Sequence, residues 1–495
     1  MSKYVGGALI PTLKIDRGDR SNLAFQLTVA LRNLILSGDL ATGTRLPASR
    51  TLARDQGVSR TTVISAFEQL AAEGLLDSRI GAGTYVSAGL RTPRQTTVEE
   101  ARPVEELPHL ARLGAGVREP FAPRLGHPPV PRAFVTGMPA FDAFPVALWS
   151  RISSQYWREN RASIMSYPDA AGLHELRQAI CQHLSANRGL VCEPEHVFIF
   201  SGAQDAFTQL ARMLVNPGDR VWLENPGAIG ARNAFLSCGA EPVAVPVDEE
   251  GIDVEAGLSA APDFRIAFVT PAYQHPLGVT MSLERRMQLL DAADRAGAFI
   301  VEDDYVGEFH YGETTLPPLK TLDGGQRVIY VGTFSKTLFP AVRLGFAVMP
   351  PALAPMIERT LAAIAHGVTH SVQGIVARFI TEGHFAAHIR RMRGIYAARR
   401  DALLDAAARD LAGRLAVRWT ETGFHTVAMI ADGGPEEWAL AKAAGDAGLA
   451  LTPLSRYALE PIARRGVALG FSAVPPVEIE RGVKALAAVI DRLAP

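Results

Sequence analysis

The chain has 495 residues, of which 48% are hydrophobic and 20% charged, and its formal net charge is −1. That length exceeds what one compact core holds, so two or more domains are expected in an ordinary globular protein. Proline, glycine or charge interrupts each apolar run before membrane-spanning length, and the N-terminus lacks a signal-peptide pattern, so we expect a cytoplasmic protein without membrane association. Three cysteines without metal-ligand spacing predict no metal site.

The charge is not evenly distributed along the chain. Residues 1–90 hold ten Lys/Arg against seven Asp/Glu, which makes this segment +3 and the remainder −4. The asymmetry permits a polyanionic partner for the first segment without requiring one.

Three helices and a hairpin are predicted before residue 90. The first helix ends near Gly38, the second ends at Gly57, and the third is capped by Ser59 and ends at Gly74. Two short strands around a Gly-Ala-Gly turn follow at residues 75–87.

The start of the third helix has the features of a DNA-reading helix. Its free N–H groups and positive dipole end suit phosphate, and short polar side chains there reach base edges. By pattern alone, any three-helix domain with exposed arginines would look the same. The candidate DNA-binding residues are Arg50, Ser59, Arg60, Thr61 and Thr62, with Gly81 and Gly83 in the turn of the hairpin.

The stretch LPASRTLARDQGVSRTTVISAFEQLAAEGLLDSRIGAGTYVS resembles the winged helix-turn-helix of the GntR regulators, over about residues 20–88. The resemblance implies binding to a double-stranded DNA operator through Arg50, Ser59, Arg60, Thr61 and the wing turn around Gly81. One departure is Ile64, where some relatives carry an arginine. An isoleucine can touch a thymine methyl group but cannot hydrogen-bond a base.

A proline-rich segment separates this domain from a larger one. Residues 89–132 lack sustained helical or strand periodicity and are predicted to be a flexible linker. Strands then alternate with helices over residues 133–495, which predicts an α/β domain around a largely parallel sheet. A smaller C-terminal α/β lobe is expected from the charged helix AAHIRRMRGIYAARRDALLDAAARD onward. The predicted strands are HVFIF, RVWLEN, PVAVPV, RIAFVT, AFIVEDD, VIYVGTFS and LGFAVMP.

A single lysine interrupts the apolar run YVGTFSKTLFPAVRLGF, which begins at Tyr330. A lysine buried among apolar groups shifts toward the neutral amine, the form that attacks a carbonyl to give a Schiff base. Around Lys336, Thr333, Ser335 and Arg343 offer the hydroxyls and guanidinium that a phosphate needs. The alternative is a lysine that extends to solvent from a strand end.

Three further motifs add to this pattern. IVEDDYVGEF ends a strand with three carboxylates, one of which could keep a pyridine nitrogen protonated. IFSGAQDAF places small residues at a strand-to-helix junction, where backbone N–H groups face an anion. TPAYQHPLG holds a polar tripeptide between prolines. Each motif alone is weak, but their order on one α/β domain is specific.

From about residue 133 onward the chain resembles fold-type I aminotransferases, and its fusion to a GntR domain resembles the MocR family of regulators, with PdxR-like members that respond to pyridoxal 5'-phosphate. The resemblance implies that Lys336 is the Schiff-base lysine, Asp303 the partner of the pyridine nitrogen and Tyr305 that of the ring 3-hydroxyl. Tyr167 would reach the cofactor phosphate of a second subunit, which implies a homodimer. The implied phosphate cup is Ala203, Gln204, Thr333, Ser335 and Arg343.

The chain departs from the aminotransferase pattern at several positions. Ala228 stands where an aromatic residue usually stacks on the ring, and Ala468 stands near where an arginine clamps the substrate carboxylate. Arg464 and Arg465 lie close by in sequence and could compensate, and the equally weighted alternative is that they face solvent. Which residue of the tripeptide at 273–275 meets the ring stays open.

These observations favour a transcriptional regulator that responds to pyridoxal phosphate over an enzyme. The resemblance suggests control of vitamin B6 synthesis or of amine and amino-acid metabolism, with an amine or amino acid as a further effector. The alternative is a pyridoxal-phosphate-dependent aminotransferase with an appended DNA-binding domain, in which some transaminase chemistry is retained. The missing arginine at Ala468 ranks this alternative lower.

Overall fold

The computed structural model describes residues 10, 13, 15, 22–79, 83–88, 128, 130–312, 316–324, 326–364 and 367–493. These residues form two compact units, one within Met1–Leu110 and one within Ala111–Pro495, called here the N-terminal and C-terminal units. Most of the segment predicted as a linker, and Gly81 of the predicted wing turn, lie outside the described residues. Among the described helices, none has the length and apolar character needed to cross a bilayer.

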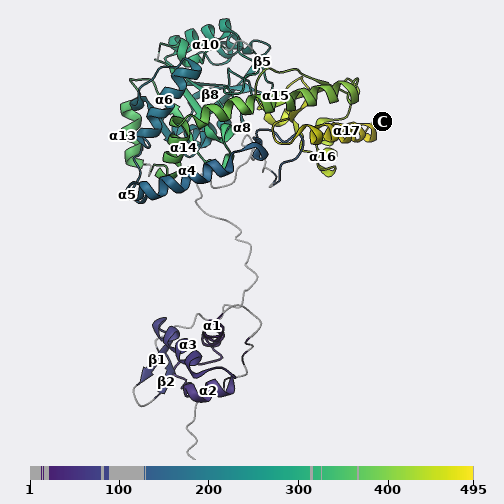
Figure 1. The fold of residues 1–495 in the computed structure, drawn as a ribbon. Helices are drawn as coiled ribbons and strands as arrows, with labels where there is room; N and C mark the ends of the chain where they lie inside the picture. Colours follow the sequence, from purple (N-terminus) through teal and green to yellow (C-terminus); the bar gives the residue numbers. More distant parts are fainter. Residues whose placement is uncertain are drawn as a thin grey trace, which may run out of the picture. The chain divides into compact units, whose positions relative to one another are not determined.

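The N-terminal unit has the predicted three helices and hairpin (Figure 1). Apolar residues at helical spacing on the first and third helices, among them Leu31 and Val63, are fully buried against each other. Ser59 caps the third helix, and its Oγ accepts a hydrogen bond from the Thr62 N–H at 3.1 Å. The elements are α1 Leu23–Leu36, α2 Ser49–Asp55, α3 Arg60–Ala72, β1 Leu76–Arg79 and β2 Gly83–Val86, and the two strands pair antiparallel.

An eight-stranded mixed sheet forms the centre of the C-terminal unit, in the order β3-β10-β9-β8-β7-β4-β5-β6. The five strands from β9 to β5 run parallel, whereas β10 is antiparallel to both of its neighbours and β6 is antiparallel to β5. The strands are β3 Val197–Phe200, β4 Arg220–Asn225, β5 Glu241–Asp248, β6 Gly251–Ile252, β7 Ile266–Val269, β8 Phe299–Asp304, β9 Val328–Thr333 and β10 Gly345–Val348. The predicted fold class is therefore confirmed.

Helices surround this sheet and bury three apolar clusters against it (Figure 1). The α-helices are α4 Val146–Glu159, α5 Arg161–Met165, α6 His174–Arg188, α7 Ala203–Leu214, α8 Ile229–Ser237, α9 Val254–Ala260, α10 Leu283–Ala296, α11 Leu319–Leu322, α12 Phe334–Thr337, α13 Ala354–Ile364 and α14 His370–Thr381. Short 3-10 turns are η1 Phe141–Ala143, η2 Pro194–His196 and η3 Pro340–Val342.

The C-terminal lobe is a separate four-stranded antiparallel sheet, in the order β11-β12-β14-β13. Its helix α17 packs against α15, the long charged helix at which the sequence predicts the lobe to begin. The elements are α15 His384–Asp410, β11 Leu415–Val417, β12 His425–Ile430, α16 Glu437–Asp446, β13 Thr452–Pro453, η4 Leu454–Tyr457, β14 Gly466–Gly470 and α17 Pro476–Leu493.

Candidate cofactor cavity and nucleic-acid interface

Lys336 lies on the short helix α12, directly after strand β9. Its Nζ donates a hydrogen bond to the Gly137 carbonyl at 2.5 Å. The apolar sequence around Lys336 predicted a fully buried side chain, but the side chain is half-buried. Gly137 has a φ of 70°, and a Cβ at this position would lie 2.8 Å from the lysine Nζ. Glycine is therefore needed at residue 137 for both its conformation and the space it leaves for the amine.

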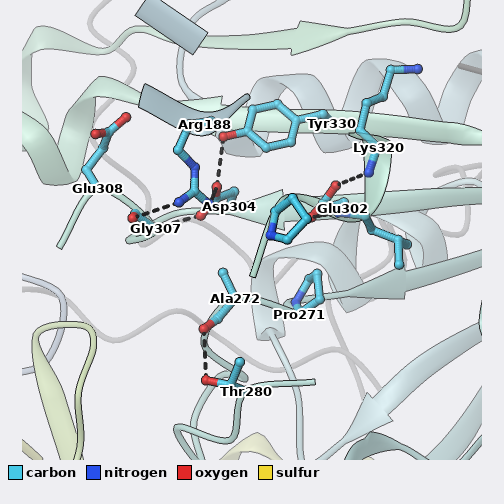
Figure 2. A network of polar contacts seen from close by, with 12 residues as sticks. Arg188, Pro271, Ala272, Thr280, Glu302, Asp304, Gly307, Glu308, Lys320 and Tyr330 are labelled. Atoms are coloured by element: carbon cyan, nitrogen blue, oxygen red, sulfur yellow. Dashed lines mark hydrogen bonds and ion pairs between the residues drawn. The ribbon is translucent and has the colours of Figure 1, made fainter. Parts of the chain in front are cut away.

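The three carboxylates of IVEDDYVGEF separate onto the two faces of β8, because successive side chains of a strand point in opposite directions. Glu302 accepts hydrogen bonds from the backbone N–H groups of Leu319 and Lys320 at 2.8 and 2.9 Å. On the same face, Asp304 forms an ion pair with Arg188 at 2.5 Å and accepts from the Tyr330 hydroxyl at 2.8 Å (Figure 2). Both carboxylates are thus bound within the protein, and Asp303 alone lines the cavity on the opposite face.

Asp303 and the adjacent Tyr305 are buried without satisfying their polar atoms. Among the described residues, Asp303 Oδ1 and the Tyr305 hydroxyl have no hydrogen-bond partner, although Asp303 and Tyr305 line the same cavity as Lys336. Burial, together with the nearby carboxylate of Asp304, raises the pKa of Asp303 to about 8. Burial also raises the pKa of Tyr305 well above its ordinary value, so the phenol stays a donor. A buried polar group without a partner is costly unless a ligand supplies one.

The predicted phosphate residues lie together at one part of this cavity, whose volume is about 270 Å³. Thr333 and Ser335 come from the turn into α12, and Ala203 and Gln204 from the first turn of α7. Gln204 uses its side chain to donate to the Gly230 carbonyl at 2.9 Å, so its backbone N–H is the group left for an anion. Arg343 completes the set.

The tripeptide at 273–275 contributes only its last residue to the cavity. The Tyr273 hydroxyl donates to the His425 carbonyl, and Gln274 donates to Glu224 and to the Pro226 carbonyl. The His275 ring lines the cavity, edge-on to Tyr305 with a centroid separation of 5.7 Å. Burial lowers the pKa of His275 well below its ordinary value, so the ring is neutral.

Further cavity residues come from segments that the sequence analysis left unassigned. Thr136 and Gly137 precede η1, Phe424 and His425 lie just before and at the start of β12, and Arg456 and Tyr457 end η4. No motif marks them in the sequence, because the fold brings together three segments more than 30 residues apart in the chain. The isolated polar pair Arg456-Tyr457 in LTPLSRYALE was the one available signal.

Four other positions are not at this cavity. Ala468 is fully buried within β14, and the Arg464 and Arg465 side chains contact Glu249 and the carbonyls of Gly434 and Pro435. Neither arginine lines the cavity, so of the two alternatives the structure does not support replacement of the missing arginine near Ala468, and Arg465 is exposed. Tyr167 is 93% exposed and is also absent from the cavity lining.

In the N-terminal unit, the candidate DNA-binding residues gather at the exposed start of α3. Ser59 Oγ lies 2.7 Å from the hydroxyls of both Thr61 and Thr62, so three hydroxyls share the cap of the helix. Arg60 is exposed, with its Nε 3.4 Å from Ser49 Oγ, and Arg50 is exposed on α2. All five therefore lie on the helix pair that the sequence predicted.

A cavity of about 430 Å³ lies between α2, α3 and β2, and it includes one arginine that the sequence analysis missed. Arg45 lines it together with Arg60, Ile64 and Gly83. Gly83 has a φ of 110°, and a Cβ there would lie 3.0 Å from the Arg45 Nε. This glycine therefore allows the arginine to lie against the wing strand.

Comparison with known proteins adds the family. Residues 140–486 match Aminotransferase class I and II, and residues 23–86 match Bacterial regulatory proteins, gntR family. The chain is 39% identical to the probable rhizopine catabolism regulatory protein MocR of Rhizobium meliloti, over 96% of this chain and 95% of that protein. The chain belongs to the MocR family. Its members include the pyridoxine biosynthesis regulator PdxR of Corynebacterium glutamicum, which is 30% identical over 93% of this chain and 94% of its own length.

Solved structures give the same assignment for the C-terminal unit of this MocR-family chain. The kynurenine aminotransferase of Pyrococcus horikoshii, in complex with PMP, has a TM-score of 0.67 and 27% identity over 73% of this chain and 91% of its own. LysN of Thermus thermophilus, complexed with N-(5'-phosphopyridoxyl)-L-leucine, has the same TM-score and identity and covers 73% and 92%. The protein is thus a DNA-binding transcriptional regulator with an aminotransferase-like domain, a fold that implies binding of pyridoxal phosphate.

The cavity residues fit that cofactor. A protonated pyridine nitrogen is the donor that Asp303 Oδ1 lacks, and a ring 3-hydroxyl group offers the acceptor that the Tyr305 hydroxyl lacks. Arg343, two hydroxyls and the start of α7 are groups that would suit its phosphate. Lys336 Nζ lies in the same cavity for the aldehyde group.

Proposed function

We propose that this protein is a transcriptional regulator that binds pyridoxal 5'-phosphate in the cavity of its C-terminal unit and changes its affinity for operator DNA in response. Lys336 binds the aldehyde carbon, Asp303 the ring nitrogen and Tyr305 the 3-hydroxyl group. Ala203, Gln204, Thr333, Ser335 and Arg343 bind the phosphate. When bound, pyridoxal phosphate supplies an aldehyde that condenses reversibly with amines and a ring that withdraws electrons.

The observation that carries the proposal is the contrast between neighbouring carboxylates on β8. Asp304 has an ion pair and two further hydrogen bonds, whereas Asp303 Oδ1 has no partner in the part of the chain that the structure describes. Leaving a buried carboxylate and a buried phenol unsatisfied costs folding free energy, about 1–3 kcal/mol for each group. A ligand with one donor and one acceptor at the spacing of a pyridine ring removes both costs.

We further propose that two copies assemble as a homodimer in which Tyr167 reaches the phosphate of the other subunit's cofactor. Tyr167 and its neighbour Met165 are 93% and 77% exposed, which is unusual for large apolar side chains side by side. Val146 and Trp157, both on α4, are exposed as well. A second subunit would cover these exposed apolar side chains. It would also bring a cofactor phosphate to Tyr167, which lies outside the cavity of its own chain.

The DNA contacts proposed for the N-terminal unit follow from the cap of α3. Arg50 and Arg60 would bind phosphates, and Ser59, Thr61 and Thr62 would lie at base edges or phosphates at the start of the recognition helix. Gly83 begins the wing strand β2, and Gly81, outside the described residues, stays a predicted contact of the wing turn. A dimer has two N-terminal units. When one unit binds DNA, the effective concentration of the other unit near the same DNA rises, which favours operators with paired half-sites.

Two measurements test the cofactor assignment and its coupling to DNA. Borohydride reduction of protein saturated with pyridoxal phosphate, followed by peptide mass spectrometry, is expected to find the added mass on Lys336. Operator affinity, measured by fluorescence anisotropy at fixed salt, is expected to change by fivefold or more on cofactor addition, the size of a typical coupling free energy. Lys336→Ala should abolish both effects. Equal operator affinity with and without cofactor would contradict the proposed response.

The second candidate is a working aminotransferase, favoured by the retention of Lys336 and Asp303 in one cavity. The chain is also 30% identical to the aromatic-amino-acid aminotransferase 1 of Thermococcus litoralis, over 72% of this chain and 86% of that enzyme. Single-turnover absorbance with a panel of amino acids separates the two functions. Conversion of the bound cofactor to its amine form within seconds by any one amino acid would establish the enzyme.

The relatives' names point to different target genes. PdxR is named for pyridoxine biosynthesis and MocR for rhizopine catabolism, and this chain is more similar to the second, at 39% against 30% identity. We infer that control of amine or amino-acid metabolism is the better working assignment, with vitamin B6 synthesis as the alternative. Operator mapping by DNA footprinting upstream of each candidate gene decides between them.

A further inference from the structure

Two of the three cysteines lie together beside helix α6. Cys181 is on the helix, and Cys192 lies in the segment between α6 and η2. Both are free thiols, and their sulfur atoms are 3.4 Å apart, within reach of an S–H···S hydrogen bond. A disulfide bond is about 2.05 Å long, so the two sulfurs need to approach by only about 1.4 Å to be joined.

The path of the chain brings Cys192 back to Cys181. Helix α6 is capped at Gly189, whose φ of 65° is left-handed and lets the chain reverse. The next residue, Leu190, is buried, and its N–H donates to the Leu184 carbonyl at 3.3 Å. The chain therefore runs back along the helix in a hydrogen-bonded path, and two sulfurs eleven residues apart in the sequence meet.

The two thiols have different surroundings. Cys181 belongs to the apolar core and is 9% exposed, whereas Cys192 is partly exposed between Val191 and Glu193, which are both exposed. The hydrogen bond between the sulfurs lowers the pKa of Cys192 and raises that of Cys181, and burial raises the pKa of Cys181 further. The Lys320 ammonium favours the Cys192 thiolate more than the Glu193 carboxylate disfavours it. Cys192 is thus the more reactive and the more accessible of the two thiols.

We propose that Cys181 and Cys192 are a redox site that a peroxide converts to a reversible disulfide, with Cys192 reacting first. The Cys192 thiolate attacks one oxygen of hydrogen peroxide, the O–O bond breaks, and hydroxide leaves and takes up a proton to become water. The sulfur of Cys181 then attacks the sulfenic acid, the S–O bond breaks, and a second water leaves. The two thiols lose two electrons, and one peroxide is reduced to two waters. The site needs neither the cofactor nor DNA.

The disulfide would close a loop that contains the end of α6. Within this loop Arg188 forms an ion pair with Asp304 and donates to the Gly307 carbonyl (Figure 2). Oxidation requires no change of fold, because the two sulfurs already lie together. A bond between residues 181 and 192 restricts the unfolded chain, so the urea midpoint of the oxidised protein should be higher than that of the reduced protein.

The main test uses the full-length wild-type protein. It is reduced, freed of reductant and treated with a small excess of hydrogen peroxide, and the remaining thiols are alkylated before digestion. Trypsin cuts after Arg177 and Arg188, which puts the two cysteines on separate peptides. We expect a peptide pair joined through Cys181 and Cys192, a fall from three free thiols per chain to one, and full recovery of the thiols with dithiothreitol.

Alanine variants test the order of the two thiols. In Cys181→Ala the sulfenic acid at residue 192 has no thiol to react with, so dimedone, which traps sulfenic acids, should label that residue. Cys192→Ala should consume peroxide at least about tenfold more slowly and give no label at residue 181. Cys238→Ala is the matched control, because the Cys238 sulfur lies 3.9 Å from the Ser237 hydroxyl rather than beside another sulfur. It should form the disulfide at the wild-type rate.

Several results would overturn the redox site. Three free thiols and an unchanged urea midpoint after peroxide treatment of the wild type would do so, and so would a disulfide to Cys238 or between two chains. Oxidation of residue 192 to a sulfinic acid without loss of the Cys181 thiol would exclude Cys181 as its partner. Dimedone labelling of residue 181 in Cys192→Ala, with no label at residue 192 in Cys181→Ala, would reverse the proposed order.

Discussion

The start of helix α3 and the cavity of the C-terminal unit both collect polar side chains, but they satisfy them differently. At α3, Ser59, Thr61 and Thr62 bond to one another and to the backbone, and Arg60 is open to water. In the cavity, Asp303 Oδ1 and the Tyr305 hydroxyl are buried without a partner. Polar groups on a nucleic-acid-binding surface are hydrated in the free protein, so they cost little folding free energy. Buried polar groups of a small-molecule site that lack a partner lower the stability of the ligand-free protein.

On the opposite face of the same strand, the carboxylate oxygens of Asp304 do have hydrogen-bond partners. Asp304, Arg188 and Tyr330 form a buried network there (Figure 2). The comparison therefore predicts that substitutions behind the cavity reduce stability, and that substitutions inside it change ligand binding.

The largest expected effect follows from Asp304→Asn. The Arg188 guanidinium would remain buried without its counter-charge, which costs about 3–5 kcal/mol when one partner of a buried pair is removed. Urea unfolding of the variant, followed by circular dichroism, should show that loss. Glu249→Gln is the control, because the Arg418–Glu249 pair is largely exposed and should contribute less than about 1 kcal/mol. Equal losses in the two variants would contradict the distinction drawn between the faces of β8.

Asp303→Asn should change the pH dependence of stability in the cofactor-free protein. Because the folded-state pKa of Asp303 is raised to about 8, above its unfolded value of 3.8, the folded state binds more protons between these values. Stability then falls as pH rises, by up to about 1.4 kcal/mol per pH unit for one group. Between pH 5 and pH 7 the wild type should lose about 2 kcal/mol more than the asparagine variant, measured by urea unfolding at each pH. If the unfolding free energies of the wild type and of Asp303→Asn changed equally with pH, the pKa of Asp303 would not be raised in the folded state.

The sequence predicts the fold, and it names several of the residues that the structure brings together at the cavity, for physical reasons. Short apolar strands, helix caps and glycine turns are local signals, and Lys336, Asp303 and Arg343 stand in motifs that span only a few residues. Strand periodicity also separates the three carboxylates of β8. Because alternate side chains face opposite sides of a strand, Asp303 lies on the face opposite to Glu302 and Asp304.

The cavity-lining residues that the sequence analysis left unassigned could not be predicted in this way. Gly137, His425 and Arg456 come from three segments, and only the packing of the C-terminal lobe beside the main sheet brings them to one cavity. The same limit explains why the sequence left two alternatives open for Arg464 and Arg465. Closeness in sequence to Ala468 does not place a side chain on the same face of β14, and both arginines precede the strand.

Gly137→Ala sharpens the comparison on the cavity side. The added Cβ would lie 2.8 Å from the Lys336 Nζ, and a φ of 70° is unfavourable for alanine. We expect a stability loss of about 1–2 kcal/mol and at least a tenfold loss of pyridoxal phosphate affinity, because the lysine must move. Gly433→Ala is the matched control, with a φ of 73° and no atom within 4 Å of the added Cβ. It should show the backbone cost with unchanged cofactor affinity, whereas weakened cofactor binding in both variants would rule out a local effect.

Ser59→Ala tests the other side of the comparison and has the smallest expected effect. Loss of the cap leaves the Thr62 N–H without its acceptor and costs about 1 kcal/mol of helix stability. Backbone amides of α3 should then exchange with deuterium about fivefold faster in the full-length protein, while those of β8 and β9 keep their rates because they belong to a separate compact unit. Ser65→Ala, an exposed position within the same helix, should leave exchange unchanged or slow it slightly, since alanine is the better helix former. Because the hydroxyls at the start of α3 are satisfied by one another, removing one of them loosens the helix without leaving a buried group unpaired, and the cofactor cavity should not respond at all.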